Sequence, residues 1–427
     1  MLAPFVCIAA PVALLAFGMP IFLVFLFAAL LFQATVLSSI PLAAIPTAIF
    51  GSLDAFALMA VPLFIYAGDI MARGGIARRL IDFILSLIGG VRGSLAVATV
   101  ASASAFGAMS GSSVACVAAI GKLTLPSLEK NGYGRTFSVS LITATGVIDV
   151  IIPPSIPMIL YAVTAQQPVN VLFLAGVVPG LLVASALAIY VLVRARFRMV
   201  AAGEPVRLAN VLARARDAVW AILAPVLILG GIYGGVFTAT EAAGIACIYA
   251  IVISVFVHRE LSLAQLWGIT KDSAVLVGQI MIIVAAAGAF SWLVTTSGLP
   301  NRLVDFISSL HMQTWMLLLV INVVLLFVGS VLEPPAAILL LAPLLTPVAQ
   351  SAGIDPIHFG LIVTVNLAIG MFMPPFGLNL FASNALFRTP LTQLYRGVMP
   401  FFFIYLGVLL LLTYVPAITL APLQWFR

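Results

Sequence analysis

The sequence predicts an all-α polytopic membrane protein with inverted structural repeats, each holding a re-entrant helical hairpin and a broken helix. The first observation is composition: 63% of the 427 residues are hydrophobic and 7% are charged, whereas a soluble domain carries roughly a quarter charged residues. The second is a set of long runs without any charge. The third is a pair of similarly spaced breaks in the two halves of the chain.

The charge-free runs set the number of membrane spans. No charged residue precedes Asp54, and further runs cover 150–193, 218–240, 273–301 and 397–426. Because a helical span needs about 20 apolar residues, the chain has room for roughly ten to twelve spans. The runs lack the alternation of apolar and polar residues that is typical of membrane β-barrel strands.

The N-terminal segment argues against a signal peptide, and the cysteines argue against a disulfide or zinc framework. Residues 1–30 have no basic n-region and no small-residue cleavage site, so we expect retained spans and not a signal peptide. Cys7, Cys116 and Cys247 lack the spacing of a disulfide or zinc framework. The formal charge of +6 comes mostly from arginine, which indicates cations in cytoplasmic loops and no nucleic-acid partner.

The elements of the first half follow in order. Two spans fit before Ser38, and a third covers about 55–71. In 73–93, arginines alternate with an apolar stripe, which predicts an amphipathic helix at the membrane surface. A long apolar segment at 136–166 is broken by PPSIP, and another span ends near 193.

The middle of the chain is its most polar part. Six arginines and a single acid, Glu204, lie within 194–216. The positive-inside rule places this basic loop in the cytoplasm. The loop also divides the chain into two halves.

The two halves carry matching breaks. SGSS at 110–113 precedes Pro153-Pro154, and GSVLEPP at 329–335 precedes Pro374-Pro375. Matching order and spacing in both halves indicate an internal duplication. The first break has basic flanks and the second is nearly neutral, so we expect the first to open to the cytoplasm and the second to the outside. Opposite orientations make the repeat an inverted one.

Breaks of this kind indicate a binding site. Inside hydrocarbon, every backbone N–H and C=O group must be satisfied internally, so a double proline in a span is costly. It is tolerated where the freed backbone lines a polar cavity, and paired breaks point to a transport site near the membrane midplane. Half-helix N-termini there attract anions, and freed carbonyl groups attract cations.

Small and polar residues flank both breaks. Hydroxyl, amide and free backbone oxygens suit a hard monovalent cation, by analogy with other hard cations. The alternative is that the small residues only allow close helix packing. The residues concerned are Ser110, Gly111, Ser112 and Ser113 in the first half, and Gly329, Asn366, Gly370, Gly377 and Asn379 in the second.

Acids inside spans are functional candidates by default. Asp149 lies one turn before the first Pro-Pro pair; it is a candidate for cation binding, proton transfer or tuning of substrate choice, or alternatively a helix cap or the partner of a nearby cation. Glu333, at the second turn, is either a site residue or a cap. Glu241 follows Thr238 and is expected to start a helix. The three histidines lie near span ends, and we expect them in loops.

These residues lie in motifs that resemble the large membrane subunit of tripartite ATP-independent periplasmic (TRAP) transporters, the DctM-like family. The motifs, in family order and over nearly the whole chain, are GSLDAFALMAVPLFIYAGDIMARGGIARRLIDF (51–83), FGAMSGSSVA (106–115), IIPPSIPMILYA (151–162), GGVFTATEAAG (234–244), GIDPIHFGLIVTVNLAIG (353–370) and PPFGLNLF (374–381). The resemblance implies an elevator-type carrier in the bacterial inner membrane, with sodium ions as coupling ions and no other cofactor. It implies uptake of an organic acid, such as a C4-dicarboxylate or a sugar acid. It also implies two partners, a small four-helix membrane subunit and a periplasmic substrate-binding protein.

The resemblance also assigns residues to sites. It implies one cation site at Ser110–Ser113 with the backbone around Gly146 and Pro153, and a second at Gly329–Glu333 with Asn366 and Gly370. Substrate would lie between the hairpin tips and the Pro-Pro breaks, at Ser112, Ser113, Pro154, Ser155, Pro374, Pro375, Gly377 and Asn379. Three residues depart from the family pattern, in which glycine, threonine and proline are usual where this chain has Asp149, Met373 and Ala239.

The chain thus divides into scaffold and transport parts. The predicted parts are 1–72 (N-terminal scaffold spans), 73–93 (amphipathic interfacial helix), 94–193 (first transport repeat), 194–216 (basic cytoplasmic loop), 217–298 (second scaffold spans), 299–393 (second transport repeat) and 394–427 (C-terminal span).

Motifs of catalysis and of ATP hydrolysis are absent from the sequence. There is no GxxxxGK[ST], HExxH or GxSxG motif, so we expect that the chain is not an enzyme. We expect the energy for its function to come from an ion gradient or from a partner. Three rival functions remain at this point. They are a stand-alone sodium/anion symporter of the same fold, a membrane-embedded lipid-modifying enzyme, and a channel.

Overall fold

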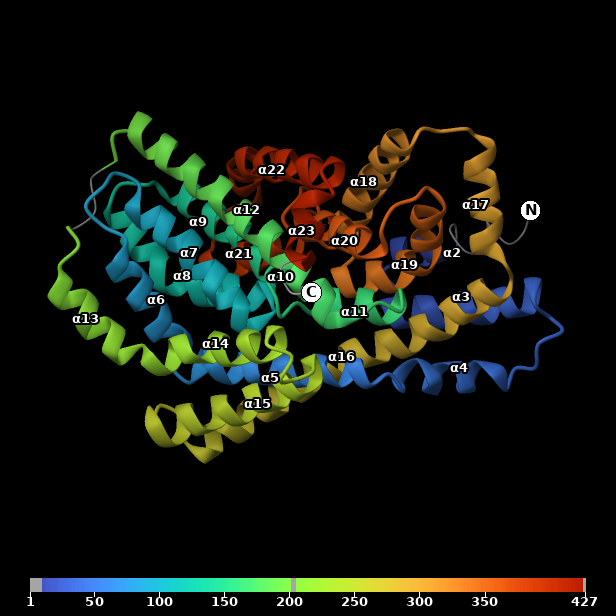
Figure 1. The fold of residues 1–427 in the computed structure, drawn as a ribbon, viewed down its shortest axis with the longest axis horizontal. Coiled ribbons are helices and arrows are strands. Elements are labelled where there is room, and N and C mark those ends of the chain that lie inside the picture. Colours follow the sequence, from blue (N-terminus) through green and yellow to red (C-terminus); the bar gives the residue numbers. More distant parts are fainter. Residues whose placement is uncertain (1–9, 201–204, 425–427) are drawn as a thin grey trace.

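The computed structural model describes residues 10–200 and 205–424, and this part of the chain is helical without any strand (Figure 1). A 3₁₀ turn, Phe56–Met59, leads into α5, and a π-helical segment, Val252–Val257, ends α15. The α-helices are α2 (Ala10–Ala16), α3 (Ile21–Val36), α4 (Ala44–Leu53), α5 (Ala60–Arg73), α6 (Ile76–Leu87), α7 (Ser94–Ser110), α8 (Ser113–Lys130), α9 (Arg135–Thr145), α10 (Ile148–Ile151), α11 (Ile156–Thr164), α12 (Val169–Phe197), α13 (Leu208–Asp217), α14 (Val219–Tyr233), α15 (Ala239–Ile251), α16 (Leu263–Thr296), α17 (Leu299–Ser309), α18 (Thr314–Val331), α19 (Pro334–Ser351), α20 (Pro356–Gly370), α21 (Leu378–Phe387), α22 (Leu391–Tyr414) and α23 (Ala417–Gln424).

The chain is a multi-span membrane protein. Within the described residues, eight helical stretches are long and apolar enough to cross a bilayer, or nine if the bent pair α13 and α14 counts as one span. Many large apolar side chains on these helices are exposed, which suits a lipid-facing surface. The class predicted from composition is therefore confirmed.

Two repeats with the same order of elements make up the rest of the architecture. In the first, the amphipathic helix α6 precedes the hairpin α7–α8, the broken helix α9–α10–α11 and the long span α12. In the second, α17 precedes the hairpin α18–α19, the broken helix α20–α21 and the span α22. The hairpin α7–α8 lies in the left half of Figure 1 and the hairpin α18–α19 in the right half.

The two repeats interlock. Beyond each proline break the chain packs on the hairpin of the other repeat, so that α11 contacts α19 and α21 contacts α8. Of the remaining helices, α4, α5, α14, α15 and α16 lie in the lower part of Figure 1, where α16 packs against α3, α4 and α5, and α15 packs against α5 and α14. Each broken helix is thus held by residues from both halves of the chain.

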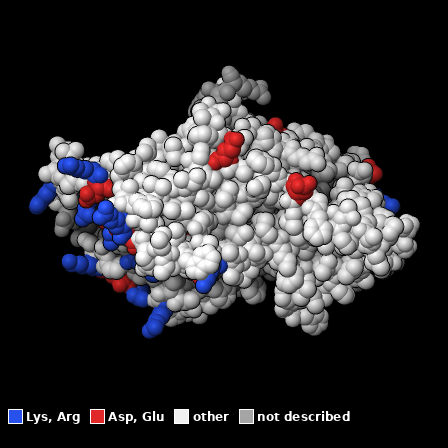
Figure 2. All heavy atoms as spheres, turned by 90° about the horizontal axis from the view of Figure 1, so that it is seen from below, with Lys and Arg blue, Asp and Glu red and all other residues white. Residues whose placement is uncertain are grey.

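Charge is concentrated at one end of the molecule. Figure 2 shows most basic side chains at the end where Figure 1 places α6 and α13, and a mostly uncharged surface between the two ends. Ion pairs tie this end together: Arg73 Nη1 lies 2.7 Å from Asp272 Oδ2, and Arg79 Nη1 lies 2.6 Å from Glu260 Oε1.

The structure differs from the sequence-based division at several boundaries. The predicted loop 194–216 is mostly helical, since α12 continues to Phe197 and α13 begins at Leu208. Arginine has a high helix propensity and extends its charged head away from an apolar stem, so a basic segment need not end a helix. The last long span begins at Leu391, three residues before the predicted boundary, and is followed by a further helix, α23.

The N-terminal prediction is tested only in part. Of the two spans predicted before Ser38, α3 is described in full, whereas the other begins in residues outside the described part and contributes only α2. Between α3 and α5 the chain forms one more apolar helix, α4, which was not predicted. A helix, α6, covers Ile76–Leu87 within the predicted range 73–93, with Ile76 and Leu80 buried against the protein, and its place at the membrane surface stays a prediction.

Candidate functional site

Each hairpin turns at a short extended segment between two helices. In the first, Gly111 has φ of +63°, a left-handed conformation that glycine adopts without steric cost, and Ser112 is extended. In the second, Leu332 and Glu333 are extended, and Pro334 begins α19 at a position where a missing N–H costs nothing. The two turns therefore use different residues and different backbone conformations.

The two broken helices separate at their proline pairs, and both pairs contain a cis peptide bond. Pro153 and Pro154 are buried, whereas Pro375 is exposed and its carbonyl accepts a 2.9 Å hydrogen bond from the Tyr395 hydroxyl. The Ser155 hydroxyl caps α11 by accepting from the Met158 N–H at 3.4 Å. The first break is thus enclosed by protein and the second is open on one side.

The first hairpin tip lies directly against the first proline break. A Cβ at Gly111 would lie 3.1 Å from the carbonyl oxygen of Pro154, so only a glycine brings the two backbones this close without displacing the neighbour. Pro153 itself lines an apolar cavity of about 510 Å³ between α7 and α12. The structure therefore brings the predicted tip and break together, with the Pro154 carbonyl facing the tip.

A first polar cluster, consisting of Ser113, Thr143, Gly146, Asn379 and Ser383, joins the two repeats. Asn379 Nδ2 donates to the Ser113 hydroxyl at 2.6 Å and to the Thr143 carbonyl at 3.4 Å. The Thr143 and Ser383 hydroxyls lie 2.7 Å apart. A Cβ at Gly146 would meet the Ser113 carbonyl at 3.3 Å, so this position keeps α8 and α9 close. Asn379 Oδ1 is buried and has no hydrogen-bond partner among the described residues.

A second polar cluster surrounds the broken helix of the second repeat and consists of Asn322, Asn366, His358, Thr413 and Thr419. Asn366 Nδ2 donates to Asn322 Oδ1 at 2.8 Å, and Asn322 Nδ2 donates to the Thr413 hydroxyl at 3.1 Å. His358 Nδ1 lies 2.8 Å from the Thr419 hydroxyl. Asn366 Oδ1 is buried and, within the described part of the chain, has no partner.

The free amide oxygens give the two clusters a shared chemistry. A buried carbonyl-type oxygen without a partner carries a desolvation cost of about 1–3 kcal/mol, so native proteins rarely leave one unsatisfied. In each cluster the amide nitrogen is already fixed by protein acceptors, which directs the oxygen away from them. Neutral oxygens of this kind are the ligands that hard cations prefer.

Some predicted cation-site residues serve packing in this conformation. Gly370 lies against the backbone of Gly329 so closely that no Cβ fits between α20 and α18. The Ser110 hydroxyl accepts a 3.3 Å hydrogen bond from the Ser112 N–H across the first tip. Glu333 holds the N-cap position of α19, but its exposed carboxylate makes no capping hydrogen bond.

The structure brings some of the predicted substrate residues together, and which of them contact substrate stays a prediction. Ser112 and Ser113 lie at the first tip, but the Ser113 hydroxyl already accepts from Asn379, and Ser155 is committed to capping. Pro374 and Gly377 form a tight turn, in which the Gly377 N–H donates to the Met373 carbonyl at 3.0 Å. Pro375 in this turn is exposed, whereas Pro153 and Pro154 at the first break are buried.

Asp149 lies in α10 at the centre of the first repeat and is fully buried. Neither carboxylate oxygen has a hydrogen-bond partner among the described residues. A Cβ at Gly107 would lie 3.1 Å from Asp149 Oδ1, which places the acid against α7 just before the hairpin tip. Its side chain neither caps a helix nor forms an ion pair in the described part of the chain.

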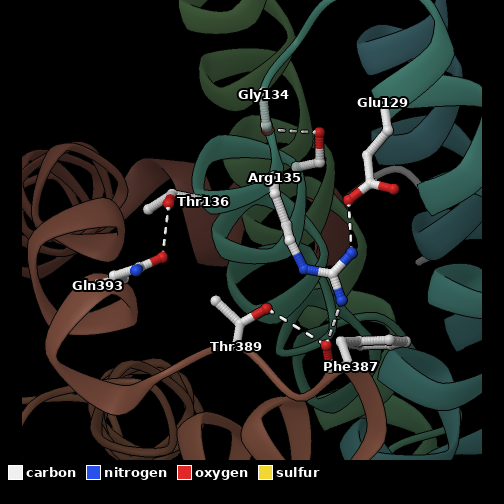
Figure 3. Close-up of polar contacts among 8 residues, drawn as sticks. Glu129, Gly134, Arg135, Thr136, Phe387, Thr389 and Gln393 are labelled. Carbon is white, nitrogen blue, oxygen red and sulfur yellow. Dashed lines mark hydrogen bonds and ion pairs between the residues drawn. The ribbon is translucent and has the colours of Figure 1, made fainter.

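Arg135 connects the first repeat with the end of α21 (Figure 3). Its guanidinium donates to Glu129 Oε1 at 2.7 Å and to the backbone carbonyl of Phe387. Beside it, the Thr136 hydroxyl lies 3.2 Å from Gln393 Oε1. These contacts fasten the turn between α8 and α9 to the segment that links α21 and α22.

Several residues of the clusters were not singled out from the sequence. Asn322 lies in a long apolar helix, and its only signal was an amide within an otherwise hydrophobic run. His358 was expected in a loop, which is wrong: it lies in the first turn of α20 and is buried. The prediction for Glu241 is confirmed, because Thr238 and Glu241 form a capping box at the start of α15.

Hairpins and broken helices that come together inside a multi-span helical protein define a class, the membrane carriers built from repeats with discontinuous helices. A family model for the DctM component of tripartite ATP-independent periplasmic transporters matches residues 8–418. The chain belongs to this family. It is therefore a permease component of a transporter, and the prediction that it is not an enzyme is confirmed.

Individual relatives agree with this assignment. The chain is 41% identical to the C4-dicarboxylate TRAP transporter large permease protein DctM of Pseudomonas aeruginosa, over 88% of both chains. It is 39% identical to the ectoine/5-hydroxyectoine TRAP transporter large permease protein UehC of Ruegeria pomeroyi, over 85% of both. It is 40% identical to the isethionate TRAP transporter permease protein DctMQ of Oleidesulfovibrio alaskensis, over 86% of this chain and 58% of that relative.

A solved structure supports the fold independently. The YdaH transporter of Alcanivorax borkumensis superposes with a TM-score of 0.69 over 93% of this chain and 98% of that one, at 14% sequence identity. At this identity the likeness concerns the fold alone.

Proposed function

We propose that the chain is the membrane permease subunit of a sodium-driven importer that takes up an organic acid delivered by a periplasmic binding protein. The observation that carries the proposal is the pair of buried amide oxygens, Asn366 Oδ1 and Asn379 Oδ1, left without a protein partner beside the broken helices. Sodium prefers neutral oxygens, and an ion gradient is the energy source open to a carrier without an ATPase motif. The proposed cation sites remain Ser110–Ser113 with Gly146 and Pro153, and Gly329–Glu333 with Asn366 and Gly370.

The printed names of relatives guide the substrate class. C4-dicarboxylates, isethionate and ectoines each carry at least one carboxylate or sulfonate group, and half-helix N-termini attract such anions. We place the substrate between the hairpin tips and the proline breaks, where α8, α11, α19 and α21 begin. The proposed partners are the binding protein and a small four-helix membrane subunit.

An elevator-type movement is part of the proposal. The helices α11 and α19, which belong to the two repeats, face α4 and α16 across a cavity of about 850 Å³. A cavity at this boundary leaves room for sliding, which a fully packed interface resists. By the positive-inside rule we place the basic end of the molecule, with its segment 194–216, in the cytoplasm.

Reconstitution tests the proposal. Proteoliposomes holding this chain and the small subunit would be given labelled organic acids, with and without a sodium gradient and with and without the binding protein. We expect uptake only when both the sodium gradient and the binding protein are present. Uptake without the binding protein would favour a stand-alone symporter, and uptake without sodium would overturn the coupling.

A double variant tests the cation sites in the same assay. Ser112→Ala with Asn366→Ala should weaken the dependence on sodium more than the docking of the binding protein. Ser86→Ala serves as control, because that hydroxyl only bonds its own helix. An unchanged sodium titration in the double variant would count against these sites.

A further inference from the structure

A cavity of about 420 Å³ lies apart from both polar clusters, where the start of α9 meets the end of α12. Its volume is within the range of small-molecule sites, about 300–1,000 Å³. Its walls include Arg135, Arg194 and Arg198, together with the glycine turn that leads into α9. A concave site lined by three guanidinium groups suits an anion better than any other ligand.

Two of the three arginines have no acidic partner in the described part of the chain. Arg135 is engaged by Glu129 and by the Phe387 carbonyl (Figure 3). Arg194 lies 4.6 Å from the centre of the Phe137 ring and donates a 3.5 Å hydrogen bond to the Tyr190 hydroxyl. Within the described residues, Arg198 makes no hydrogen bond or ion pair. The cavity therefore keeps two positive charges that these neighbours do not balance.

The start of α9 adds free donors to the same cavity. Its N-cap is Gly134, which has no side chain to cap the helix, and the first helical hydrogen bond runs from Ser138 to Gly134. Within the described residues, the backbone N–H groups of Arg135, Thr136 and Phe137 have no acceptor. Free N–H groups and the positive end of the helix dipole both favour an anion.

A second basic cavity of the same molecule shows the opposite arrangement. It measures about 400 Å³ and holds Arg78, Arg79 and Arg214, but also Asp82. There, Arg79 pairs with Glu260 at 2.6 Å and Arg214 with Asp82 at 3.5 Å. The positive charge of that cavity is balanced by the protein's own acids. Of these two basic cavities, the one between α9 and α12 is therefore the one suited to an external anion.

The exposed side chains beside the cavity favour a lipid as the source of the anion. The last turn of α12 and the residue after its cap expose large apolar side chains: Phe197 is 83% exposed and Met199 is 76% exposed. Apolar side chains exposed this fully beside arginines suit acyl chains next to a headgroup.

We propose that the cavity between α9 and α12 binds the phosphate of an anionic phospholipid headgroup, whose acyl chains lie along the end of α12. Arg194 and Arg198 supply the charge, and the free N–H groups of α9 supply the hydrogen bonds. An inorganic phosphate ion shares this chemistry but lacks the acyl chains. The proposal depends on neither sodium coupling nor the transported substrate.

Native mass spectrometry of the purified full-length chain in detergent tests the proposal. Phosphatidylglycerol, phosphatidylcholine and inorganic phosphate would be titrated separately, and the number and affinity of bound lipids measured. We expect one tight phosphatidylglycerol site in the unchanged chain, bound in preference to phosphatidylcholine. Arg194→Gln with Arg198→Gln should weaken it roughly 30-fold, and Arg198→Gln alone roughly fivefold.

The matched control is Arg196→Gln, which removes an exposed arginine of the same helix turn that does not line the cavity. This variant should bind as the unchanged chain does. Equal binding in the double variant, an equal loss in the control, or displacement of the lipid by millimolar phosphate would each overturn the lipid assignment. Because Arg198 is exposed, its single variant keeps the test valid even if the Arg194 change disturbs folding.

Discussion

Asn366 and Asn379 carry the main argument at the scale of single residues. Each uses its amide nitrogen on protein acceptors and keeps its oxygen buried without a partner among the described residues. Asn322 makes this possible in the second cluster, because it accepts from Asn366 and is itself held by Thr413. Residues that orient a ligand typically change cation affinity 10–100-fold when altered.

The first prediction concerns Asn322→Ala. Removing its oxygen takes away one of the two acceptors of Asn366 Nδ2 and leaves the Ile362 carbonyl at 2.7 Å, so the amide is held less firmly. We therefore expect the sodium concentration for half-maximal uptake to rise roughly tenfold, with little change in substrate affinity. Sodium titrations of uptake measure this. Asn210→Ala, an exposed change in α13, is the control. If the sodium titration of the Asn322 variant matches that of the control, Asn322 does not position the site.

The second prediction concerns Asp149→Asn. Replacing an unpartnered buried carboxylate by a neutral group of similar shape removes a desolvation cost, so the melting temperature should stay constant or rise. The preference for substrate or coupling ion should shift in uptake assays, because the residue lies against α7 beside the first hairpin tip.

Asp355 provides the comparison for this variant. Its carboxylate caps α20 by accepting from the Ile357 N–H at 2.8 Å, and Asp355→Ala should cost about 1 kcal/mol. Thermal unfolding in detergent distinguishes the two aspartates. A large drop in melting temperature for Asp149→Asn would show that the acid is structural.

At the scale of elements, close approach between helices decides the geometry of the breaks. The helices α18 and α20 meet through Gly329 and Gly370, where only hydrogen fits between the two backbones. In the first repeat, Gly146 serves α8 and α9 in a similar way. Each broken helix thus needs small residues at the contact and not only at the break.

The third prediction concerns Gly370→Ala. The added methyl group would collide with the backbone of Gly329, so α18 and α20 must separate, at a cost of about 1–3 kcal/mol. We expect a lower melting temperature and weaker sodium dependence. Gly407→Ala, in open space on α22, should leave both unchanged or raise stability slightly. Equal behaviour of the two variants would argue against close packing at Gly370.

At the scale of the whole molecule, the two repeats interlock and also pack on the scaffold helices, where α16 contacts α19 and α5 contacts α7. Because α11 contacts α19 and α21 contacts α8, the two hairpins and two broken helices form one unit. A cavity of about 850 Å³ lies between this unit and the pair α4 and α16. The proposed elevator-type movement would take place at this boundary.

The fourth prediction concerns Ala48→Trp, which fills that cavity from α4. If the unit slides along the scaffold, we expect the uptake rate to fall roughly tenfold, with sodium affinity unchanged. Phe50→Trp adds bulk to the same helix on an exposed side and should transport normally. Normal uptake by the Ala48 variant would contradict movement at this boundary.

Much of the architecture was predictable because the bilayer makes strict demands on sequence. Spans must be apolar and nearly free of charge, so the runs before Asp54 and within 150–193 marked membrane helices directly. Proline cannot continue a helix, so Pro153-Pro154 and Pro374-Pro375 marked the breaks. The predicted hairpins, broken helices and amphipathic α6 are accordingly present.

The arrangement of the polar residues was decided by tertiary structure alone. Nothing near Asn379 in the sequence shows that its partner is Ser113, in the other half of the chain. Nothing near Asn322 shows that it holds Asn366.

Sequence by itself thus determined the membrane class, the two repeats and the places where helices break, because these follow from local hydrophobicity and backbone chemistry. Only the tertiary structure decided which amide oxygens stay free, which glycines face a backbone and where arginines converge. These depend on contacts between segments far apart in the chain, and no local pattern encodes such contacts.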